Sequence, residues 1–264
     1  MDAHESAARA AAERAAGIVR ERWHGRKDVT TKSTAIDLVT ETDRACEDAI
    51  VGALKQAFPA YAVLGEESGA QGQGPYRWIV DPIDGTTNFA HTYPQVAISI
   101  GLVHQSERIF GLVLDPLRAE TFTAHRGEGA FLNGEPITVS KTGELGGSLL
   151  ATGFPYDRRE RADFYLAYFR AFMLRTQGLR RAGSAALDLC WVAAGRVDGF
   201  WEWKLHPWDV AAGSLIVEEA GGRTSDFEGN LFDAFGDQML ATNGSLHEPM
   251  LEVLREVGRA ASAA

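Results

Sequence analysis

Apolar positions recur at two spacings along the chain, and the spacing predicts which segments form helices and which form strands. In the first half, helical spacing predicts helices at 2–23 and 40–57, the second ended by Pro59. Strands are predicted at 62–64, 78–80, 95–103, 109–114 and 120–125, with glycine turns at 127–129 and 133–134. The polar segment 27–39 is predicted to be a loop or hairpin, and 69–74 a surface loop. We therefore expect helices packed on an antiparallel sheet.

The second half repeats this mixture of strands and helices. Strands are predicted at 148–153, 199–203 and 239–242, and helices at 161–173, 184–194 and 246–259. A further helix is predicted to begin at His206-Pro207, where proline suits the first turn, and to end at Gly221-Gly222. No repeat or linker interrupts the chain. We expect one layered α/β domain over 1–264, with approximate halves 1–145 and 146–264.

Composition narrows the class of protein. Hydrophobic residues make up 45% of the chain and charged residues 23%, which is typical of a globular protein. The net charge of −10 argues against a nucleic-acid surface, and an acidic protein that handles an anion needs a cation as mediator. No segment is long and apolar enough to span a membrane. Cys46 and Cys190 lack metal-site spacing and are predicted to be buried thiols, so we expect a cytoplasmic protein.

The stretch 78–89 is the strongest candidate for chemistry. The apolar strand Trp78–Val80 is followed by Asp81-Pro82-Ile83-Asp84-Gly85, which we expect to break the strand. Thr86-Thr87-Asn88 then suits the capping of a short helix. Carboxylates are ligands of hard cations, and the start of a helix is an anion site. We therefore expect a metal ion and a phosphate to meet here.

Other carboxylates also stand where elements begin or end, and each has a simpler interpretation. Asp43 and Asp209 suit the positive ends of their helices, and Glu66 suits a solvated turn. Asp81 or Asp84 suits an Asx turn. Two carboxylates this close at one strand end nevertheless repel each other unless a cation lies between them, which favours a metal site.

Three motifs together resemble the signature of the inositol monophosphatase family. They are Gly65-Glu66-Glu67-Ser68, the stretch Trp78–Phe89, and His206-Pro207-Trp208-Asp209 with Glu219–Gly222 after it. Their order and spacing match, and the similarity runs from about Lys32 to the C-terminal region. The resemblance implies a five-layered αβαβα sandwich, Mg²⁺-dependent hydrolysis of phosphate monoesters, sensitivity to lithium, and a homodimer.

The resemblance also implies roles for individual residues. Glu66, Asp81 and the main-chain carbonyl of Ile83 would hold one Mg²⁺, and Asp81, Asp84 and Asp209 a second, with Glu66 assisting a third through water. Thr86, paired with Asp43, would orient and deprotonate the attacking water. The N–H groups of Gly85 and Thr86 would hold the phosphate, and Lys32 matches a basic position near the metals.

The substrate is the least constrained part of the prediction. Gly183, Ser184, Ala185, Glu202 and His206 match positions that face the substrate in the family, although Glu202 also suits an ordinary outward strand position. Asp-Gly-Thr-Thr-Asn-Phe favours a small polyol phosphate, with myo-inositol 1-phosphate first. Fructose 1,6-bisphosphate, 3′-phosphoadenosine 5′-phosphate and histidinol phosphate remain alternatives. An alternative of another class is a regulatory binding protein of the transcription machinery.

Overall fold

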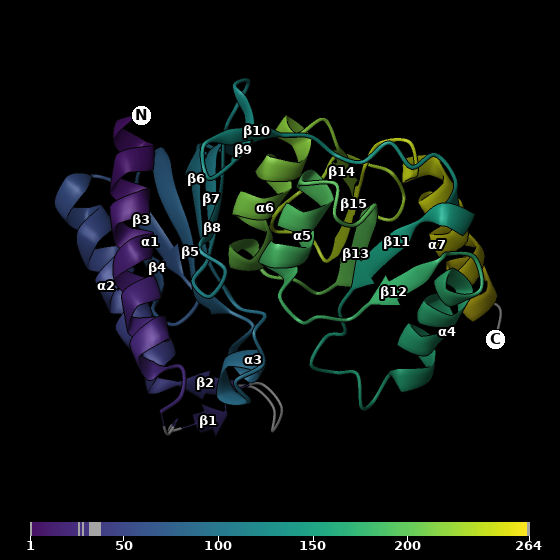
Figure 1. The fold of residues 1–264 in the computed structure, drawn as a ribbon, viewed down its shortest axis with the longest axis horizontal. Coiled ribbons are helices and arrows are strands. Elements are labelled where there is room, and N and C mark those ends of the chain that lie inside the picture. Colours follow the sequence, from purple (N-terminus) through teal and green to yellow (C-terminus); the bar gives the residue numbers. More distant parts are fainter. Residues whose placement is uncertain (1, 26, 28, 32–37, 263–264) are drawn as a thin grey trace.

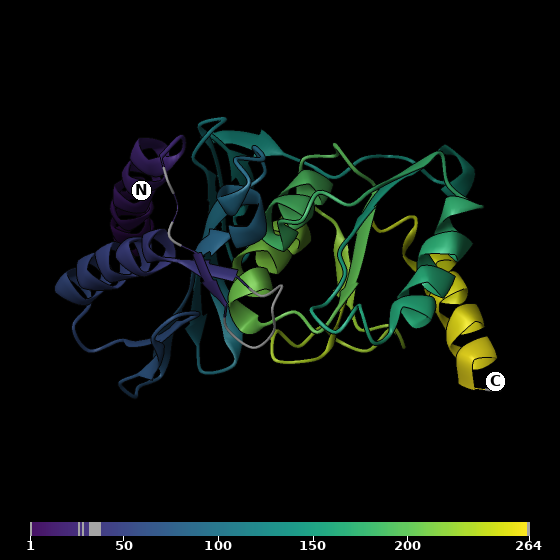
Figure 2. The same ribbon diagram turned by 90° about the horizontal axis from the view of Figure 1, so that it is seen from below.

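The elements of the chain stack in five layers. The structure, a computed structural model, describes residues 2–25, 27, 29–31 and 38–262. Two helices cover a large sheet, two more lie between this sheet and a smaller one, and a last pair covers the far side (Figure 1). The turned view places the amino-terminal helix and the carboxyl-terminal helix at opposite ends of the stack (Figure 2). The predicted αβαβα sandwich is confirmed.

The bounds of the elements follow the predicted ones closely. The helices are α1 (Ala3–Arg22), α2 (Glu41–Ala57), α3 (Thr86–Ala90), α4 (Ala162–Met173), α5 (Ala185–Ala193), α6 (Pro207–Glu219) and α7 (His247–Ser262), with a 3₁₀ turn at Leu145–Gly147. The strands are β1 (Val29–Thr31), β2 (Leu38–Thr40), β3 (Ala62–Gly65), β4 (Gly69–Gln71), β5 (Tyr76–Asp84), β6 (Ala97–His104), β7 (Glu107–Asp115), β8 (Glu120–His125), β9 (Gly129–Leu132), β10 (Glu135–Ile137), β11 (Leu149–Thr152), β12 (Gly178–Arg180), β13 (Gly199–Trp203), β14 (Arg223–Ser225) and β15 (Gln238–Thr242). The short edge strands were not expected because three residues carry too little pattern.

The large sheet has eight strands in the order β10-β9-β8-β7-β6-β5-β3-β4. Its pairs are antiparallel except β3 with β5, so the expectation of an entirely antiparallel sheet is wrong at this pair. The reason is that β4 folds back along one edge of β3 and β5 then joins the other edge. The loop predicted at 69–74 is also wrong in part, because Gly69–Gln71 pairs with β3 through its backbone, which requires no apolar pattern.

The outer helices pack on this sheet through small side chains. Asp2 caps the start of α1, and its alanines at helical spacing are fully buried, which lets α1 lie close to α2. Thr40 and Asp43 form a capping box at the start of α2. Cys46 is a free, buried thiol on α2 and Cys190 one on α5, as predicted.

Helix α6 lies against the inner face of the large sheet at very short range. A Cβ added at Gly111 would lie 2.7 Å from the carbonyl oxygen of Ala212, and one at Gly101 would lie 3.1 Å from Cβ of Ala211. At the start of the helix, the hydroxyl of Ser99 donates to the carbonyl oxygen of Trp208 (3.0 Å). Ser99 pairs with Asp81 across β5 and β6, so this contact brings Asp209 to the carboxyl end of β5.

The smaller sheet, in the order β12-β11-β13-β15-β14, is covered on its outer face by α4 and α7. Because α6 belongs to the second half of the chain and packs on the sheet of the first, both halves contribute to the middle of the molecule. The division into halves at 145 stays a prediction. Across the described residues, no helix combines the length and apolarity that crossing a membrane requires.

Candidate metal and phosphate site

The end of β5 carries the central carboxylates of the site. Pairing with β6 continues to Asp84, with a register shift between Asp81 and Asp84, so the expectation that the strand breaks at Asp81 is wrong. Pro82 has no N–H to donate, and a local irregularity is how a strand accommodates it. The N–H of Ile83 donates instead to Oδ1 of Asp81 (3.0 Å).

Three carboxylates from two elements meet at this point. One oxygen each from Asp81, Asp84 and Asp209 lie within 4.8 Å of one another, and Asp81 is only 2% exposed. Burial, with the charges of Glu66, Asp84 and Asp209, raises the pKa of Asp81 well above its usual value. Burial and Asp209 raise the pKa of Asp84 to about 7, although hydrogen bonds from Ser184 and Ala186 oppose this shift.

The chemistry of this cluster fits a hard divalent cation. Within the described ranges, no lysine or arginine forms an ion pair with any of the three carboxylates. Like charges held this close in a buried site are unfavourable unless protonated or bridged by a cation. All the donors are oxygens, which is the ligand set that Mg²⁺ prefers. The predicted metal residues Asp81, Asp84 and Asp209 are therefore brought together.

Glu66 reaches the cluster from the turn after β3, and a buried glutamate shapes this turn. Glu66 interacts with Asp81, and its N–H donates to the carbonyl oxygen of Val80 (3.2 Å). Glu47, 2% exposed on α2, accepts the N–H groups of Glu67 (2.8 Å) and Ser68 (2.7 Å). A Cβ added at Gly65 would lie 2.7 Å from the carboxylate of Glu47. Glu47 was not predicted, although its place one helical turn after Asp43 is visible in the sequence.

The contacts of Glu47 predict a selective defect in Glu47→Gln. The substitution replaces one acceptor oxygen with an NH₂ group that faces a backbone donor, so the turn that carries Glu66 must shift. We expect the free energy of unfolding without metal to fall by about 1–3 kcal/mol. The Mg²⁺ concentration for half-maximal activity should rise several-fold, as measured by urea unfolding and Mg²⁺ titration. Asp48→Asn, on the exposed face of the same helix, is the control; equal values for both variants would contradict the role of Glu47.

Thr86 and Asp43 form a buried hydrogen-bonded pair beside the cluster. The hydroxyl of Thr86 lies 2.9 Å from Oδ1 of Asp43 and 3.1 Å from the carbonyl oxygen of Ile83. Oδ2 of Asp43 accepts the N–H (2.8 Å) and hydroxyl (2.5 Å) of Thr40. Gly85, at φ 97°, is the residue before α3, so the hydroxyl of Thr86 serves Asp43 and Ile83 rather than capping α3. Thr86 and Asp43, which the resemblance pairs, are therefore in direct contact.

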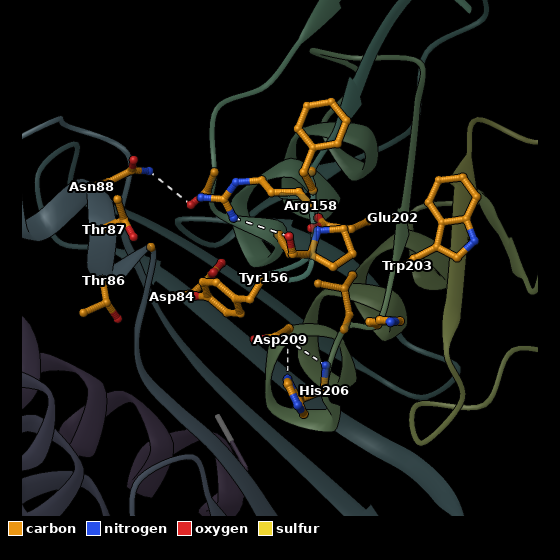
Figure 3. Close-up of a pocket in the computed structure, with 18 of the residues that line it drawn as sticks. Asp84, Thr86, Thr87, Asn88, Tyr156, Arg158, Glu202, Trp203, His206 and Asp209 are labelled. Carbon is orange, nitrogen blue, oxygen red and sulfur yellow. Dashed lines mark hydrogen bonds and ion pairs between the residues drawn. The ribbon is translucent and has the colours of Figure 1, made fainter. Parts of the chain in front are cut away.

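A pocket of about 540 Å³ opens above these residues (Figure 3). Of the predicted site residues, it is lined by Glu66, Asp84, Gly85, Thr86, Gly183, Ala185, Glu202, His206 and Asp209. Burial raises the pKa of Glu202 to about 8. The imidazole of His206 stacks on Trp208 with ring centroids 4.8 Å apart. Lys32 lies outside the described residues.

Ser184 does not line the pocket as expected, because its hydroxyl is engaged elsewhere. It donates to Oδ2 of Asp84 (2.6 Å), which also accepts the N–H of Ala186 (2.7 Å). Asp84 therefore holds the start of α5 against the end of β5. Asn88, not predicted as a site residue, adds a second link, because its amide lies 2.9 Å from the carbonyl oxygen of Ala182 and 3.1 Å from that of Gly183. The loop at 182–185 is thus fixed to both elements.

Comparison with known proteins agrees with this geometry. Residues 1–259 match the model of the inositol monophosphatase family. The chain is 49% identical over 227 residues to a protein of Pseudomonas aeruginosa named Nus factor SuhB, covering 83% of this chain and 84% of that one. It is 47% identical to the inositol-1-monophosphatase of Synechocystis sp., over 88% of this chain and 82% of the relative. The crystal structure of the extragenic suppressor protein suhB from Bartonella henselae superposes with a TM-score of 0.92 at 39% identity, covering 96% and 98% of the two chains.

Proposed function

The chain belongs to the inositol monophosphatase family, and we propose that it hydrolyses phosphate monoesters of small polyols, with myo-inositol 1-phosphate first among them. Membership of this family makes the protein a phosphoric monoester hydrolase. The observation that carries the proposal is the cluster of the buried Asp81 and Asp84 with the partly buried Asp209, beside the Thr86–Asp43 pair. A cation site and a group able to take a proton from water are the two requirements of this hydrolysis.

The carboxylates are assigned to Mg²⁺ as the resemblance implies. Glu66, Asp81 and the carbonyl oxygen of Ile83 would hold one ion, and Asp81, Asp84 and Asp209 a second, with Glu66 assisting a third. Bound Mg²⁺ would lower the pKa of a water molecule and neutralise charge on the phosphoryl oxygens. The short distances among Asp81, Asp84 and Asp209 support the site assigned to the second ion, and the interaction of Glu66 with Asp81 supports the assignment of Asp81 to both.

Thr86 and Asp43 are assigned to the proton of the attacking water. Because the hydroxyl of Thr86 donates to Asp43, its lone pairs remain to accept from a water in the pocket. As the water attacks, its proton passes to Oγ1 of Thr86 while the proton of Thr86 passes to Oδ1 of Asp43. The N–H and hydroxyl of Thr40 donate to Oδ2 of Asp43, which leaves Oδ1 as the oxygen that faces Thr86 and receives its proton. The N–H groups of Gly85 and Thr86, at the start of α3, are assigned to the phosphate.

The remaining lining residues are assigned to the leaving alcohol. Glu202, 9% exposed and facing the pocket, suits the hydroxyl groups of a polyol, and Gly183, Ala185 and His206 complete this side. Ser184 would act through Asp84 rather than by touching the substrate.

A phosphate-release assay with Mg²⁺ tests the proposed function. We expect release from myo-inositol 1-phosphate, with a kcat/KM above those for fructose 1,6-bisphosphate, 3′-phosphoadenosine 5′-phosphate and histidinol phosphate. The same preparation of Asp81→Asn is the control for a contaminating phosphatase. No hydrolysis of any of the four would refute the enzymatic role, and a higher kcat/KM for one of the rivals would transfer the assignment to it.

A regulatory binding role is the second candidate, because the Pseudomonas relative is named a Nus factor. Binding of a partner requires an exposed surface and not the buried carboxylate cluster. Asp81→Asn therefore separates the two roles: it should remove phosphate release and leave partner capture intact. If a pull-down with RNA polymerase recovered nothing from either protein, the binding role would be dropped.

We also propose a homodimer and a cytoplasmic location. Exposed apolar side chains at the end of α4 support the dimer, since Met173 is 54% exposed and Leu174 is 63% exposed. Light scattering that gave the mass of one chain would refute it. The two free buried thiols support a reducing compartment.

A further inference from the structure

Among the described residues that line the pocket beside the carboxylate cluster, one large aromatic side chain is exposed. Tyr156, in the segment between β11 and α4, lines this pocket and is 42% exposed. The phenylalanine and the two tryptophans of the same lining are buried or half-buried. Figure 3 shows Tyr156 inside the pocket, between Asp84 and Glu202 in this view. A molecule that enters the pocket can therefore contact this ring.

The backbone holds Tyr156 in a tight turn. The N–H of Arg158 donates to the carbonyl oxygen of Pro155 (3.1 Å), which makes Tyr156 and Asp157 the two central residues of the turn. The N–H of Arg161, the residue before α4, donates to the carbonyl oxygen of Asp157 (3.1 Å). The turn is thus joined directly to the start of a helix, which fixes the place from which the side chain of Tyr156 extends.

The side chains on either side of Tyr156 anchor the turn to other elements. Asp157 accepts the hydroxyl of Tyr165 from α4 (2.7 Å) and the ammonium of Lys204 from the end of β13 (2.6 Å). The ring of Phe154, which is half-buried, lies 6.5 Å from that of Tyr165 between centroids. A ring carried by an anchored turn loses little freedom when a ligand packs against it, so its contact can contribute to affinity.

The pocket offers two kinds of contact to an alcohol. The carboxyl group of Glu202 is assigned to hydroxyl groups, and the ring of Tyr156 presents a flat apolar face. A cyclic polyol matches both, because its hydroxyl groups lie at the edge and its C–H groups on the faces. In myo-inositol most hydroxyl groups are equatorial, so most C–H bonds point to the two faces of the ring. An acyclic polyol such as glycerol has no rigid apolar face.

Tyr156 also has a simpler interpretation as an ordinary surface residue, since single exposed aromatic side chains are common. Tyr93 is such a residue, because it is 52% exposed and does not line this pocket. Two observations favour a ligand contact for Tyr156. It lines the pocket that contains the carboxylate cluster, and its turn is held by hydrogen bonds from two other elements.

We propose that Tyr156 packs on the ring of the leaving alcohol and so selects cyclic polyols over acyclic ones. The inference rests on the proposed phosphatase function and narrows its substrate class. The phosphate would lie at the start of α3, and the ring of the alcohol between Tyr156 and Glu202. The pocket of about 540 Å³ has room for a ring of this size. Tyr156 is assigned to binding alone and takes no part in proton transfer.

Tyr156→Ala tests this assignment with one cyclic and one acyclic substrate. We expect the KM for myo-inositol 1-phosphate to rise about tenfold with kcat little changed, because an apolar contact made equally in the bound state and the transition state is lost. The KM for glycerol 2-phosphate should change by less than about twofold, since glycerol has little apolar face to lose. Tyr156→Phe keeps the ring and should stay close to the wild type with both substrates. Tyr93→Ala, the matched control, should change neither KM.

The outcomes separate this inference from the proposed function. An equal rise in KM for both substrates, a phenylalanine variant as weak as the alanine variant, or an equal effect of Tyr93→Ala would each overturn the ring contact. If glycerol 2-phosphate is not hydrolysed, its inhibition constant replaces its KM.

If the wild type releases no phosphate from myo-inositol 1-phosphate, the proposed function fails and a binding measurement decides the ring contact. The measurement is a calorimetric titration with myo-inositol 1-phosphate in Ca²⁺, a cation that takes the same oxygen ligands. Binding that is about tenfold weaker in Tyr156→Ala would support the contact. Equal affinity of the two proteins, or binding to neither, would refute it.

Discussion

Asp81→Asn is expected to abolish turnover and, in the absence of metal, to stabilise the fold. The carboxylate of Asp81 is assigned to both ions, so its loss should reduce kcat/KM about 10³-fold or more. The asparagine keeps an oxygen for the N–H of Ile83 and removes one negative charge from a buried cluster. The two effects have opposite signs, which a variant that merely misfolds cannot show.

The sign of the stability change follows from the pKa of Asp81. Folding raises this pKa above its usual value of 3.8, so the folded state binds the proton more tightly than the unfolded state. The metal-free protein therefore loses stability as the pH rises above the unfolded value. Asp81→Asn removes this loss, and we expect its free energy of unfolding in EDTA at neutral pH to be higher by about 1 kcal/mol or more.

Thermal or urea unfolding in EDTA, together with phosphate release in Mg²⁺, measures both effects. Asp237→Asn, an exposed substitution outside the cluster, is the control and should change neither quantity. Activity like that of the wild type in Asp81→Asn would show that the metal assignment is wrong. Lower stability in EDTA would show that repulsion does not dominate in the empty cluster.

Thr86→Val is expected to reduce kcat by about 10²–10³-fold with a much smaller change in KM. Valine has nearly the volume of threonine, so it fills the same buried space and removes only the hydroxyl that contacts Asp43 and Ile83. Thr86→Ser restores this hydroxyl and should recover most of the rate. A serine variant as slow as the valine variant would indicate that Thr86 acts through packing.

The pairing of Thr86 with Asp43 also predicts how the effects of the two substitutions on kcat combine. If the two residues transfer one proton together, removing either should remove the whole contribution, so Thr86→Val/Asp43→Asn should be no slower than the slower single variant. Multiplication of the two single effects would mean that they act independently. The Mg²⁺ concentration for half-maximal activity should stay unchanged in Thr86→Val, because its hydroxyl is not assigned to a metal.

Local pattern was enough to locate the long elements. Helical spacing predicted α1, α2, α4 and α7, because each buries one face along its length. Helices α5 and α6 are buried on nearly all sides between the two sheets, so their apolar stretches were recognised together with start and end signals such as His206-Pro207 and Gly221-Gly222. It did not predict β4 or the shift in β5 at Asp81–Asp84, because edge pairing and bulges depend on a partner strand and not on side-chain order.

The candidate metal ligands were recognisable from sequence for a different reason. Asp81 and Asp84 lie within one motif, and the motifs of Glu66 and Asp209 have a combined order and spacing that few other sequences share. Glu47 lies outside these motifs, and the position of Asn88 within the stretch Trp78–Phe89 does not reveal that it holds the loop at 182–185. Their contacts join segments far apart in the chain, as in the link from Asn88 to Gly183.

The sequence by itself determined the positions of the long helices and strands and the acidic chemistry, because these depend on local spacing and on short, distinctive motifs; the fold class and the pairing of Thr86 with Asp43 came from the family resemblance that those motifs carry. Only the tertiary structure decided that Ser184 serves Asp84 instead of the pocket, and that Glu47 holds the turn beside Glu66. The physical reason is that such contacts form where segments from separate elements meet. The spacing of these residues along the chain does not determine how close they lie in space.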